Sequence, residues 1–110
     1  MKIIACDFDG TLCENRFPEI GPPHREVIAR LIDERQKGTR IILWSCREGA
    51  ILEEAVRWCE VHGLTFDAVN DNLPETKEWM AYNSRKVFAH EYWDDRGGVL
   101  SPEAAPNSEQ

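Results

Sequence analysis

Short apolar runs in this chain alternate with longer stretches in which apolar residues recur at helical spacing. Unbroken apolar runs are typical of inner strands that are covered on both faces of a sheet, whereas apolar residues at i, i+3 and i+4 indicate amphipathic helices. One predicted strand begins at Ile3, and the other predicted elements are helices at 24–37 and 50–62 and strands at 40–44, 65–69 and 87–93. A glycine follows each predicted helix, which is a common way for a helix to end.

Three other stretches have no such period. Residues 12–22 are rich in proline and glycine, so we expect an irregular loop there. Residues 70–84 are polar, with a short helix at 75–82 as one option. Residues 99–110 contain two prolines and no periodic pattern, which predicts a flexible tail. One domain is therefore expected over residues 1–98.

Strands that alternate with helices at this spacing indicate βαβ units with right-handed crossovers. The prediction is an α/β fold of three layers, Rossmann-like, with a mostly parallel central sheet and helices on both faces. In such folds functional residues gather at the carboxyl ends of the strands.

The composition narrows the class of protein. A chain of 110 residues with 42% hydrophobic and 30% charged residues suits one globular domain. It has neither an apolar run of the roughly 20 residues that a membrane-spanning helix needs nor a signal-peptide pattern, so we expect a cytoplasmic protein without a membrane partner. The formal net charge of −7 argues against general binding to nucleic acid, which depends on Lys and Arg. The four cysteines form no C-x-x-C pair and are expected to be reduced thiols.

Polar side chains follow three of the predicted strands. Asp7 and Asp9 come at the exit of the first strand, where alternation would direct both to one side. Ser45 follows the second strand, and Asp94 and Asp95 follow the last. Clustered carboxylates repel one another unless a cation compensates them, and all-oxygen ligands suit Mg²⁺. The sequence therefore predicts a magnesium site formed by Asp7, Asp9, Asp94 and Asp95.

These residue types suit phosphoryl transfer. Beside a bound Mg²⁺, Asp7 could attack a phosphoryl group and form an aspartyl-phosphate. Asp9 could protonate the leaving oxygen and later activate water. Ser45 would donate a hydrogen bond to a phosphoryl oxygen, and a lysine would offset negative charge during the transfer.

The sequence around these residues resembles the haloacid dehalogenase-like (HAD) superfamily in four places. Residues 7–12, Asp-Phe-Asp-Gly-Thr-Leu, match its first motif, and residues 41–45, an apolar strand that ends in serine, resemble its second. Lys86 resembles the third-motif lysine, and residues 93–96, Trp-Asp-Asp-Arg, are similar to the acidic fourth motif. The resemblance covers about residues 1–98.

This resemblance implies a HAD-like fold and a Mg²⁺-dependent phosphatase that hydrolyses a phosphomonoester through an aspartyl-phosphate. Asp7 would be the nucleophile and a metal ligand, and Asp9 would be the acid and base, binding metal through its backbone carbonyl. Of the final pair, Asp95 is favoured as the more direct ligand and Asp94 as a supporting one. The dehalogenases of the superfamily lack the second aspartate of the first motif, so Asp9 implies phosphate chemistry.

The remaining site residues follow from the same resemblance. Lys86 is expected to fill the third-motif role, and Lys77 is the alternative because the spacing from Lys86 to the fourth motif is short. Substrate contacts are expected from Ser45, Cys46, Arg47 and Lys86, with an ordinary exposed arginine as the alternative at Arg47.

Two further expectations concern access to the site. Members of the superfamily commonly carry an inserted cap domain, but the intervals between the motifs leave no room for one here, which implies a capless member. An open site would admit a phosphorylated small molecule or the exposed phosphate end of a larger substrate.

The main alternative is a phospho-acceptor or phosphate-binding regulatory module with little turnover. Receiver domains also combine an acidic strand exit, Mg²⁺, a hydroxyl and a lysine. Their linear order differs, because the acceptor aspartate lies on a middle strand and the lysine comes last. A scaffold protein without turnover is disfavoured, since an unused cluster of carboxylates is destabilising.

Overall fold

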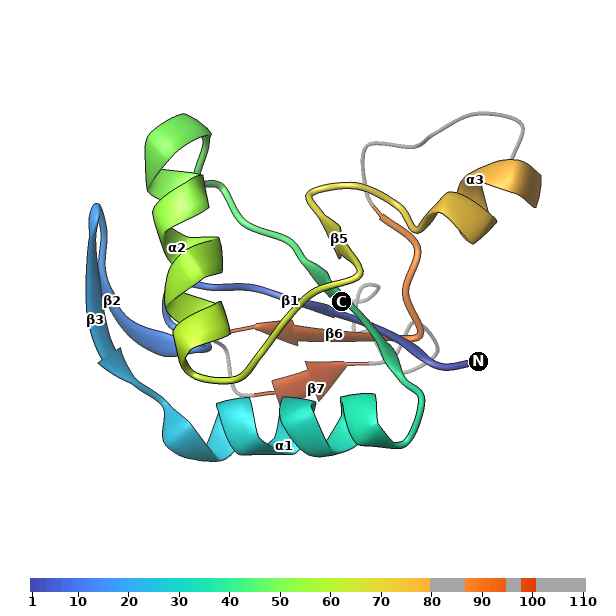
Figure 1. Cartoon of the computed structure of the whole chain (residues 1–110), viewed down its shortest axis with the longest axis horizontal. Coiled ribbons are helices and arrows are strands. Elements are labelled where there is room, and N and C mark those ends of the chain that lie inside the picture. The colour runs from blue at the N-terminus through green and yellow to red at the C-terminus, as the bar shows by residue number, and fades with distance from the viewer. Residues whose placement is uncertain (80–86, 95–97, 101–110) are drawn as a thin grey trace, which may run out of the picture.

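A five-stranded sheet forms the centre of the molecule, and a separate two-stranded hairpin lies beside it (Figure 1). The computed structural model describes residues 1–79, 87–94 and 98–100. The strand order in the sheet is β5-β4-β1-β6-β7, and β2 and β3 form the hairpin. In chain order the elements are β1 (Ile3–Cys6), β2 (Cys13–Arg16), β3 (Glu19–Pro23), α1 (Arg25–Gln36), β4 (Arg40–Leu43), α2 (Gly49–Val61), β5 (Ala68–Val69), α3 (Pro74–Trp79), β6 (Glu91–Asp94) and β7 (Gly98–Leu100).

The central sheet is mostly parallel, as the sequence predicts. β1 lies in the middle and pairs in parallel with β4 on one side and β6 on the other, so that Cys6 is level with Leu43 and with Trp93. β4 pairs in parallel with β5, and β7 pairs antiparallel with β6 at the other edge. The α/β class and the mostly parallel sheet are therefore confirmed.

The two long helices cover the same face of the sheet, which differs from the prediction of helices on both faces. Side chains of α1 and α2 pack in one buried cluster with the strand residues Ile4, Cys6, Ile41 and Leu43. The chain moves from β1 to β4 and on to β5 in one direction, and right-handed crossovers in one direction place both helices on one face. The opposite face of β1 and β4 is covered by Leu73, just before α3, and by Val87 and Ala89.

The long helices match their predicted ranges within one residue at each end. α1 buries Ile28 and Leu31, and α2 buries Ala55 and Cys59. Both helices are followed within two residues by a glycine with positive φ, +99° at Gly38 and +89° at Gly63. The sequence pattern is sufficient here because amphipathic spacing and a terminating glycine are both local signals.

The prediction of an irregular loop over residues 12–22 is wrong. The segment forms the antiparallel hairpin of β2 and β3. The two strands lie so close that a side chain on Gly21 would collide with the backbone carbonyl of Glu14. Most side chains of the hairpin are exposed, so the alternation that announces a half-buried strand is absent.

The last predicted strand, 87–93, is shorter than expected. β6 begins at Glu91, because the N–H groups of the two residues at 88 and 89 donate to side chains instead of a neighbouring strand. The N–H of Phe88 donates to Asn72 Oδ1 at 2.6 Å, and the N–H of Ala89 donates to the hydroxyl of Tyr92 at 3.2 Å. The predicted strand at 65–69 is likewise reduced to the two residues of β5.

The flexible tail predicted for residues 99–110 includes two residues that belong to a strand. Val99 and Leu100 belong to β7 and pair with Trp93 and Tyr92 of β6, although the segment has no longer periodic pattern. Residues 101–110 lie outside the described residues. The optional helix at 75–82 corresponds to α3, Pro74–Trp79, and residues 80–86 also lie outside the described part.

The described segments between the strands are short. A hairpin and α1 join β1 to β4, and α2 joins β4 to β5. No cap domain is present among the described residues. None of the helices in this part of the chain is long and apolar enough to cross a lipid bilayer.

Candidate functional site

Three of the predicted site residues lie together at the carboxyl ends of neighbouring strands. Asp7 follows β1, Ser45 follows β4, and Asp94 ends β6, and β1 lies between the other two strands. The N–H of Asp7 donates to the carbonyl of Trp93 at 2.9 Å, and the N–H of Trp44 donates to the carbonyl of Cys6 at 2.9 Å. The hydrogen bonds of β1 with β4 and with β6 therefore continue up to the point where the polar residues begin.

The chain turns immediately after β1. Asp7 is half-buried, and its Oδ1 accepts the N–H of Phe8 at 2.8 Å. The carbonyl of Phe8 accepts the N–H groups of Thr11 and Leu12, and Gly10 has φ of +89°. Asp7 and Asp9 are thus not alternate residues of one strand, and the carboxylate of Asp9 has partners of its own.

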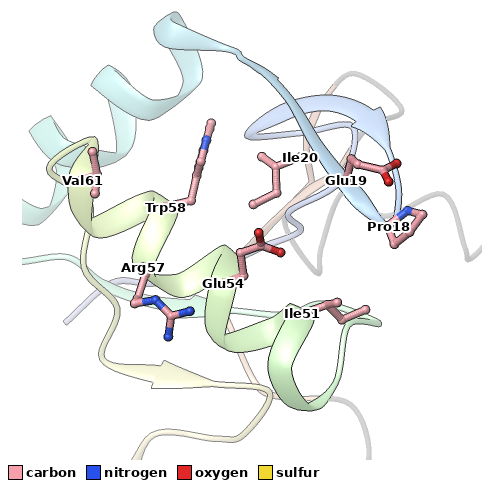
Figure 2. Close-up of a pocket in the computed structure, with 8 residues that line it drawn as sticks. All are labelled: Pro18, Glu19, Ile20, Ile51, Glu54, Arg57, Trp58 and Val61. Atoms are coloured by element: carbon pink, nitrogen blue, oxygen red, sulfur yellow. The ribbon is translucent and has the colours of Figure 1, made fainter.

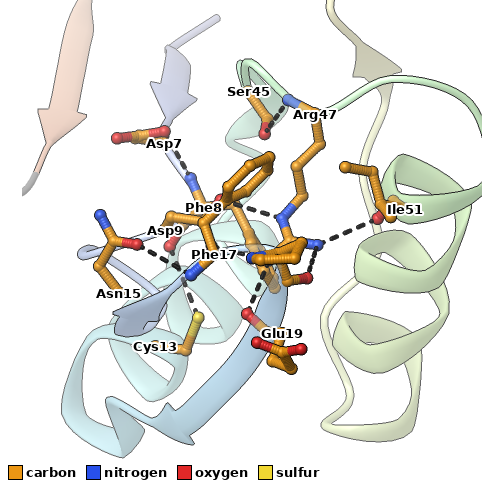
Figure 3. A network of polar contacts seen from close by, with 11 residues as sticks. Asp7, Phe8, Asp9, Cys13, Asn15, Phe17, Glu19, Ser45, Arg47 and Ile51 are labelled. Carbon is orange, nitrogen blue, oxygen red and sulfur yellow. Dashed lines mark hydrogen bonds and ion pairs between the residues drawn. The ribbon is translucent and has the colours of Figure 1, made fainter.

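The carboxylate of Asp9 forms a two-pronged ion pair with Arg47 (Figure 3). Arg47 Nε donates to Asp9 Oδ2 and Arg47 Nη2 donates to Asp9 Oδ1, both at 2.9 Å. This hydrogen-bonded carboxylate is the largest cause of a raised pKa at Arg47, and the guanidinium stays charged. The Arg47 side chain has no exposed surface, and that of Asp9 is 16% exposed.

Arg47 also binds three backbone carbonyls. Its Nη1 donates to the carbonyls of Pro18 at 3.1 Å and Ile51 at 3.3 Å, and its Nη2 donates to that of Glu19 at 3.0 Å. A guanidinium has five N–H donors, and these contacts account for all five. In the structure Arg47 therefore has no donor left for a phosphate, and it is not the exposed arginine of the alternative interpretation.

Ser45 is held by Asn70, which no motif in the sequence indicates. Its N–H donates to Asn70 Oδ1 at 2.7 Å, and its Oγ accepts the N–H of Arg47 at 3.1 Å. Asn70 has φ of +54° and donates its own N–H to the carbonyl of Leu43 at 2.7 Å. Asparagine is the non-glycine residue that best tolerates this conformation, so an asparagine directly after a short strand was the available signal.

Of the remaining predicted residues, the structure describes Cys46 and Lys77. Cys46 is an exposed thiol directly after Ser45. Lys77 forms an ion pair with Asp71 at 2.7 Å, and Asp71 follows β5, whereas Asp7 follows β1, two strands away in the sheet. Lys86 and Asp95 lie outside the described residues, and their roles stay predictions.

The donor set is compatible with a hard cation. Asp7 and Asp94 carry carboxylates and lie at the ends of the neighbouring strands β1 and β6, and oxygen ligands are those that Mg²⁺ prefers. Because Asp9 directs its carboxylate to Arg47, its backbone carbonyl is the group left for metal binding. Within residues 1–79, 87–94 and 98–100, no three His, Cys, Asp or Glu side chains form a cluster that would hold an ion by themselves, so the described side chains would need backbone, solvent or substrate oxygens to complete the coordination.

A groove of about 840 Å³ runs between the hairpin and α2 (Figure 2). Pro18, Glu19 and Ile51 line it and also supply the carbonyls that Arg47 binds. Trp58 and Val61 extend it along α2. Of the predicted site residues that the structure describes, none lines this groove. Arg47 connects the two places, because it binds Asp9 as well as the carbonyls of Pro18, Glu19 and Ile51.

Comparisons with models of known protein families and with curated proteins find no match. A solved structure is similar: that of a conserved protein from Bacteroides thetaiotaomicron, with 43% sequence identity and a TM-score of 0.76. The match covers 87% of this chain and 77% of that chain. The two proteins belong to one family. The name of the Bacteroides relative gives no activity. The family relationship therefore supports the α/β fold.

Proposed function

We propose that this protein is a Mg²⁺-dependent phosphatase that hydrolyses a phosphomonoester through a phosphorylated Asp7. The observation that carries the proposal is the meeting of Asp7, Ser45 and Asp94 at the carboxyl ends of three adjacent parallel strands. The resemblance of residues 7–12 to the first HAD motif gives these residues their roles. The Rossmann-like HAD fold without a cap is part of the same proposal.

The nucleophile is Asp7. Its Oδ1 is bonded to the N–H of Phe8, which fixes the carboxylate while its other oxygen attacks phosphorus. Ser45 Oγ accepts a hydrogen bond from the backbone of Arg47, so its own O–H proton is available to a phosphoryl oxygen. Developing negative charge on the phosphoryl group is stabilised by such preorganised donors.

Asp9 transfers the proton. It donates a proton to the leaving oxygen as the bond from phosphorus to that oxygen breaks, and it then takes a proton from the water that hydrolyses the aspartyl-phosphate. Asp7, Asp94 and the backbone carbonyl of Asp9 would hold Mg²⁺, with Asp95 as the further predicted ligand. The bound ion supplies charge neutralisation between the carboxylate nucleophile and the anionic substrate.

The substrate class follows from the open surroundings. No described segment forms a cap over the ends of β1, β4 and β6. A phosphorylated small molecule or the phosphate end of a larger substrate could reach Asp7 there. Cys46, exposed beside Ser45, is a described side chain that such a substrate would contact.

Hydrolysis of p-nitrophenyl phosphate in the presence of Mg²⁺ tests the proposal. The wild-type protein should release p-nitrophenol, and Asp7→Asn should abolish release because the amide is not a nucleophile. The matched control is Asp33→Asn, which removes an exposed carboxylate on α1 that pairs with Lys37 and should leave activity unchanged. Acid-quenched wild-type protein should carry phosphate that hydroxylamine removes, as expected of an acyl phosphate.

Two outcomes would contradict the proposal. Full activity in Asp7→Asn would exclude Asp7 as the nucleophile. Stable phosphorylation of Asp7 by acetyl phosphate, without turnover of any phosphomonoester, would instead identify a phospho-acceptor module.

A further inference from the structure

Arg47 joins Asp9 to two other segments of the chain. Its guanidinium binds the carboxylate of Asp9, the carbonyls of Pro18 and Glu19 in the β2–β3 hairpin, and the carbonyl of Ile51 in α2. These partners lie between four and 38 residues away along the sequence. A lysine could replace the charge but not the five directed bonds.

Two aromatic rings enclose the same guanidinium. The centre of the guanidinium lies 5.0 Å from the ring centroid of Phe8 and 5.3 Å from that of Phe17. Phe8 is fully buried, whereas Phe17 is 55% exposed. Phe17 thus forms an outer cover over a charge that has no contact with solvent, and it can be removed without opening the core.

The two-pronged contact determines where Asp9 points. Each oxygen of Asp9 accepts one N–H from Arg47 and keeps a second lone pair. A proton can therefore be held on the side away from Arg47. After proton transfer the carboxylate is negatively charged, and the guanidinium compensates that charge in a setting almost closed to water.

We propose that Arg47 is a positioning residue that aims Asp9 at the leaving oxygen and stabilises the carboxylate formed there. This inference rests on the proposed phosphatase function. In the step concerned, Asp7 forms a bond to phosphorus, the bond from phosphorus to the leaving oxygen breaks, and the proton of Asp9 passes to that oxygen. The products are the phosphorylated Asp7, a neutral alcohol or phenol, and the Asp9 carboxylate paired with Arg47.

Leaving-group dependence tests this role. p-Nitrophenolate leaves with little help from an acid, whereas phenolate depends on protonation, so a misplaced Asp9 slows phenyl phosphate more than p-nitrophenyl phosphate. A general acid contributes roughly 10²–10⁴-fold, and we expect Arg47→Lys to lower kcat/KM for phenyl phosphate at least about tenfold more than for p-nitrophenyl phosphate. Asp9→Asn should give the same preference, and Arg47→Lys added to Asp9→Asn should lower kcat/KM no further, because both changes affect one proton transfer.

Two further variants separate an effect on catalysis from a general effect on folding. Arg57→Lys replaces an arginine of α2 that lines the groove between the hairpin and α2, and it should leave both rates unchanged. Phe17→Ala loosens the outer cover of Arg47 at an exposed position, and it should lower kcat/KM for phenyl phosphate several-fold more than for p-nitrophenyl phosphate. If Arg47→Lys does not fold, Phe17→Ala decides.

The outcomes separate the two proposals. Equal losses on both substrates, in Arg47→Lys or in Phe17→Ala when the former does not fold, would show that Arg47 only joins the hairpin to α2 and would overturn the positioning role. An inactive wild-type protein on both aryl phosphates would remove the phosphatase function and, with it, this inference.

Discussion

Asn70 Oδ1 accepts the backbone N–H of Ser45 at 2.7 Å, across the ends of two neighbouring strands. The same asparagine has a positive φ and bonds the carbonyl of Leu43 through its own N–H. One residue therefore fixes the turn from which the hydroxyl of Ser45 would reach a phosphoryl group.

Two substitutions at Asn70 separate the hydrogen bond from the backbone conformation. Asn70→Gly keeps the positive φ and removes the acceptor, whereas Asn70→Ala removes the acceptor and adds strain of about 1 kcal/mol. We expect kcat/KM for p-nitrophenyl phosphate to fall about tenfold in both variants, while urea denaturation shows Asn70→Ala to be the less stable. Activity that follows stability instead would mean that Asn70 acts through folding alone.

Asp94 is expected to contribute to magnesium binding. Asp94→Asn should raise the Mg²⁺ concentration for half-maximal activity by roughly tenfold or more, and it should reduce the increase in Tm that Mg²⁺ gives the wild-type protein. Glu91→Gln is the control, because it removes a charge from the same strand at a position that pairs with Lys2. A normal Mg²⁺ response in Asp94→Asn would assign the metal to other oxygens.

Cys46 should be the thiol that reacts in the folded protein. It is exposed, whereas Cys6, Cys13 and Cys59 are buried, and burial raises the pKa of Cys59 to about 12 and that of Cys6 well above its usual value. Because the thiolate is the reactive form, a native titration with Ellman's reagent should detect one fast thiol and a titration in guanidinium chloride all four.

The location of Cys46 beside Ser45 gives this labelling a functional readout. Inorganic phosphate with Mg²⁺ should slow the modification of Cys46, and Cys46→Ser should remove the fast phase. Unchanged labelling in the presence of phosphate would place the substrate away from Cys46.

Stability at low pH should depend on Glu34. The hydroxyl of Thr39 donates to Glu34 Oε1 at 2.7 Å, and this bond, followed by the charge of Lys2, lowers the pKa of Glu34 below its usual 4.5. A carboxylate whose pKa is lower in the folded chain stabilises the fold above its unfolded pKa, and this stabilisation is lost as the pH falls through the folded pKa. Thr39→Val should therefore lower the free energy of unfolding by about 1 kcal/mol at pH 7.

The difference between wild type and Thr39→Val should shrink as the pH falls below 4.5, the usual pKa of Glu34. Glu34→Gln keeps an acceptor for Thr39 without a titrating charge, so in that background the effect of Thr39→Val should not vary over this range. Urea denaturation at pH 7 and at lower pH measures both effects, and a constant difference in the wild-type background would contradict the role of Glu34.

Local signals in the sequence were enough for β1, β4 and both long helices. The pattern of Ile28 and Leu31 in α1 and the glycine at position 38 depend on neighbours within a few residues, so they can be read without knowledge of the fold. The length of the strand predicted at 87–93 was overestimated, because its start depends on contacts that are not local. Its first N–H groups are taken by Asn72 and Tyr92, and a side chain 16 residues away cannot be inferred from an apolar run.

The candidate site likewise combines features that local sequence signals predict with features that depend on long-range contacts. The order of Asp7, Ser45 and Asp94 at strand ends follows from the alternation of strands and helices. The ion pair of Asp9 with Arg47 spans 38 residues and depends on the hairpin, which the sequence did not predict because most of its side chains face solvent. The position of an arginine among backbone carbonyls is a property of the tertiary structure.

The edges of the central sheet are short. At one edge β5 has two residues, and at the other β7 has three. An edge strand is a template on which a strand of another chain can pair, and the length of the edge limits the number of hydrogen bonds in such a pairing. The described part of this sheet offers little length for growth into an intermolecular β-structure, and this protects a fold whose apolar inner strands would aggregate if they were exposed.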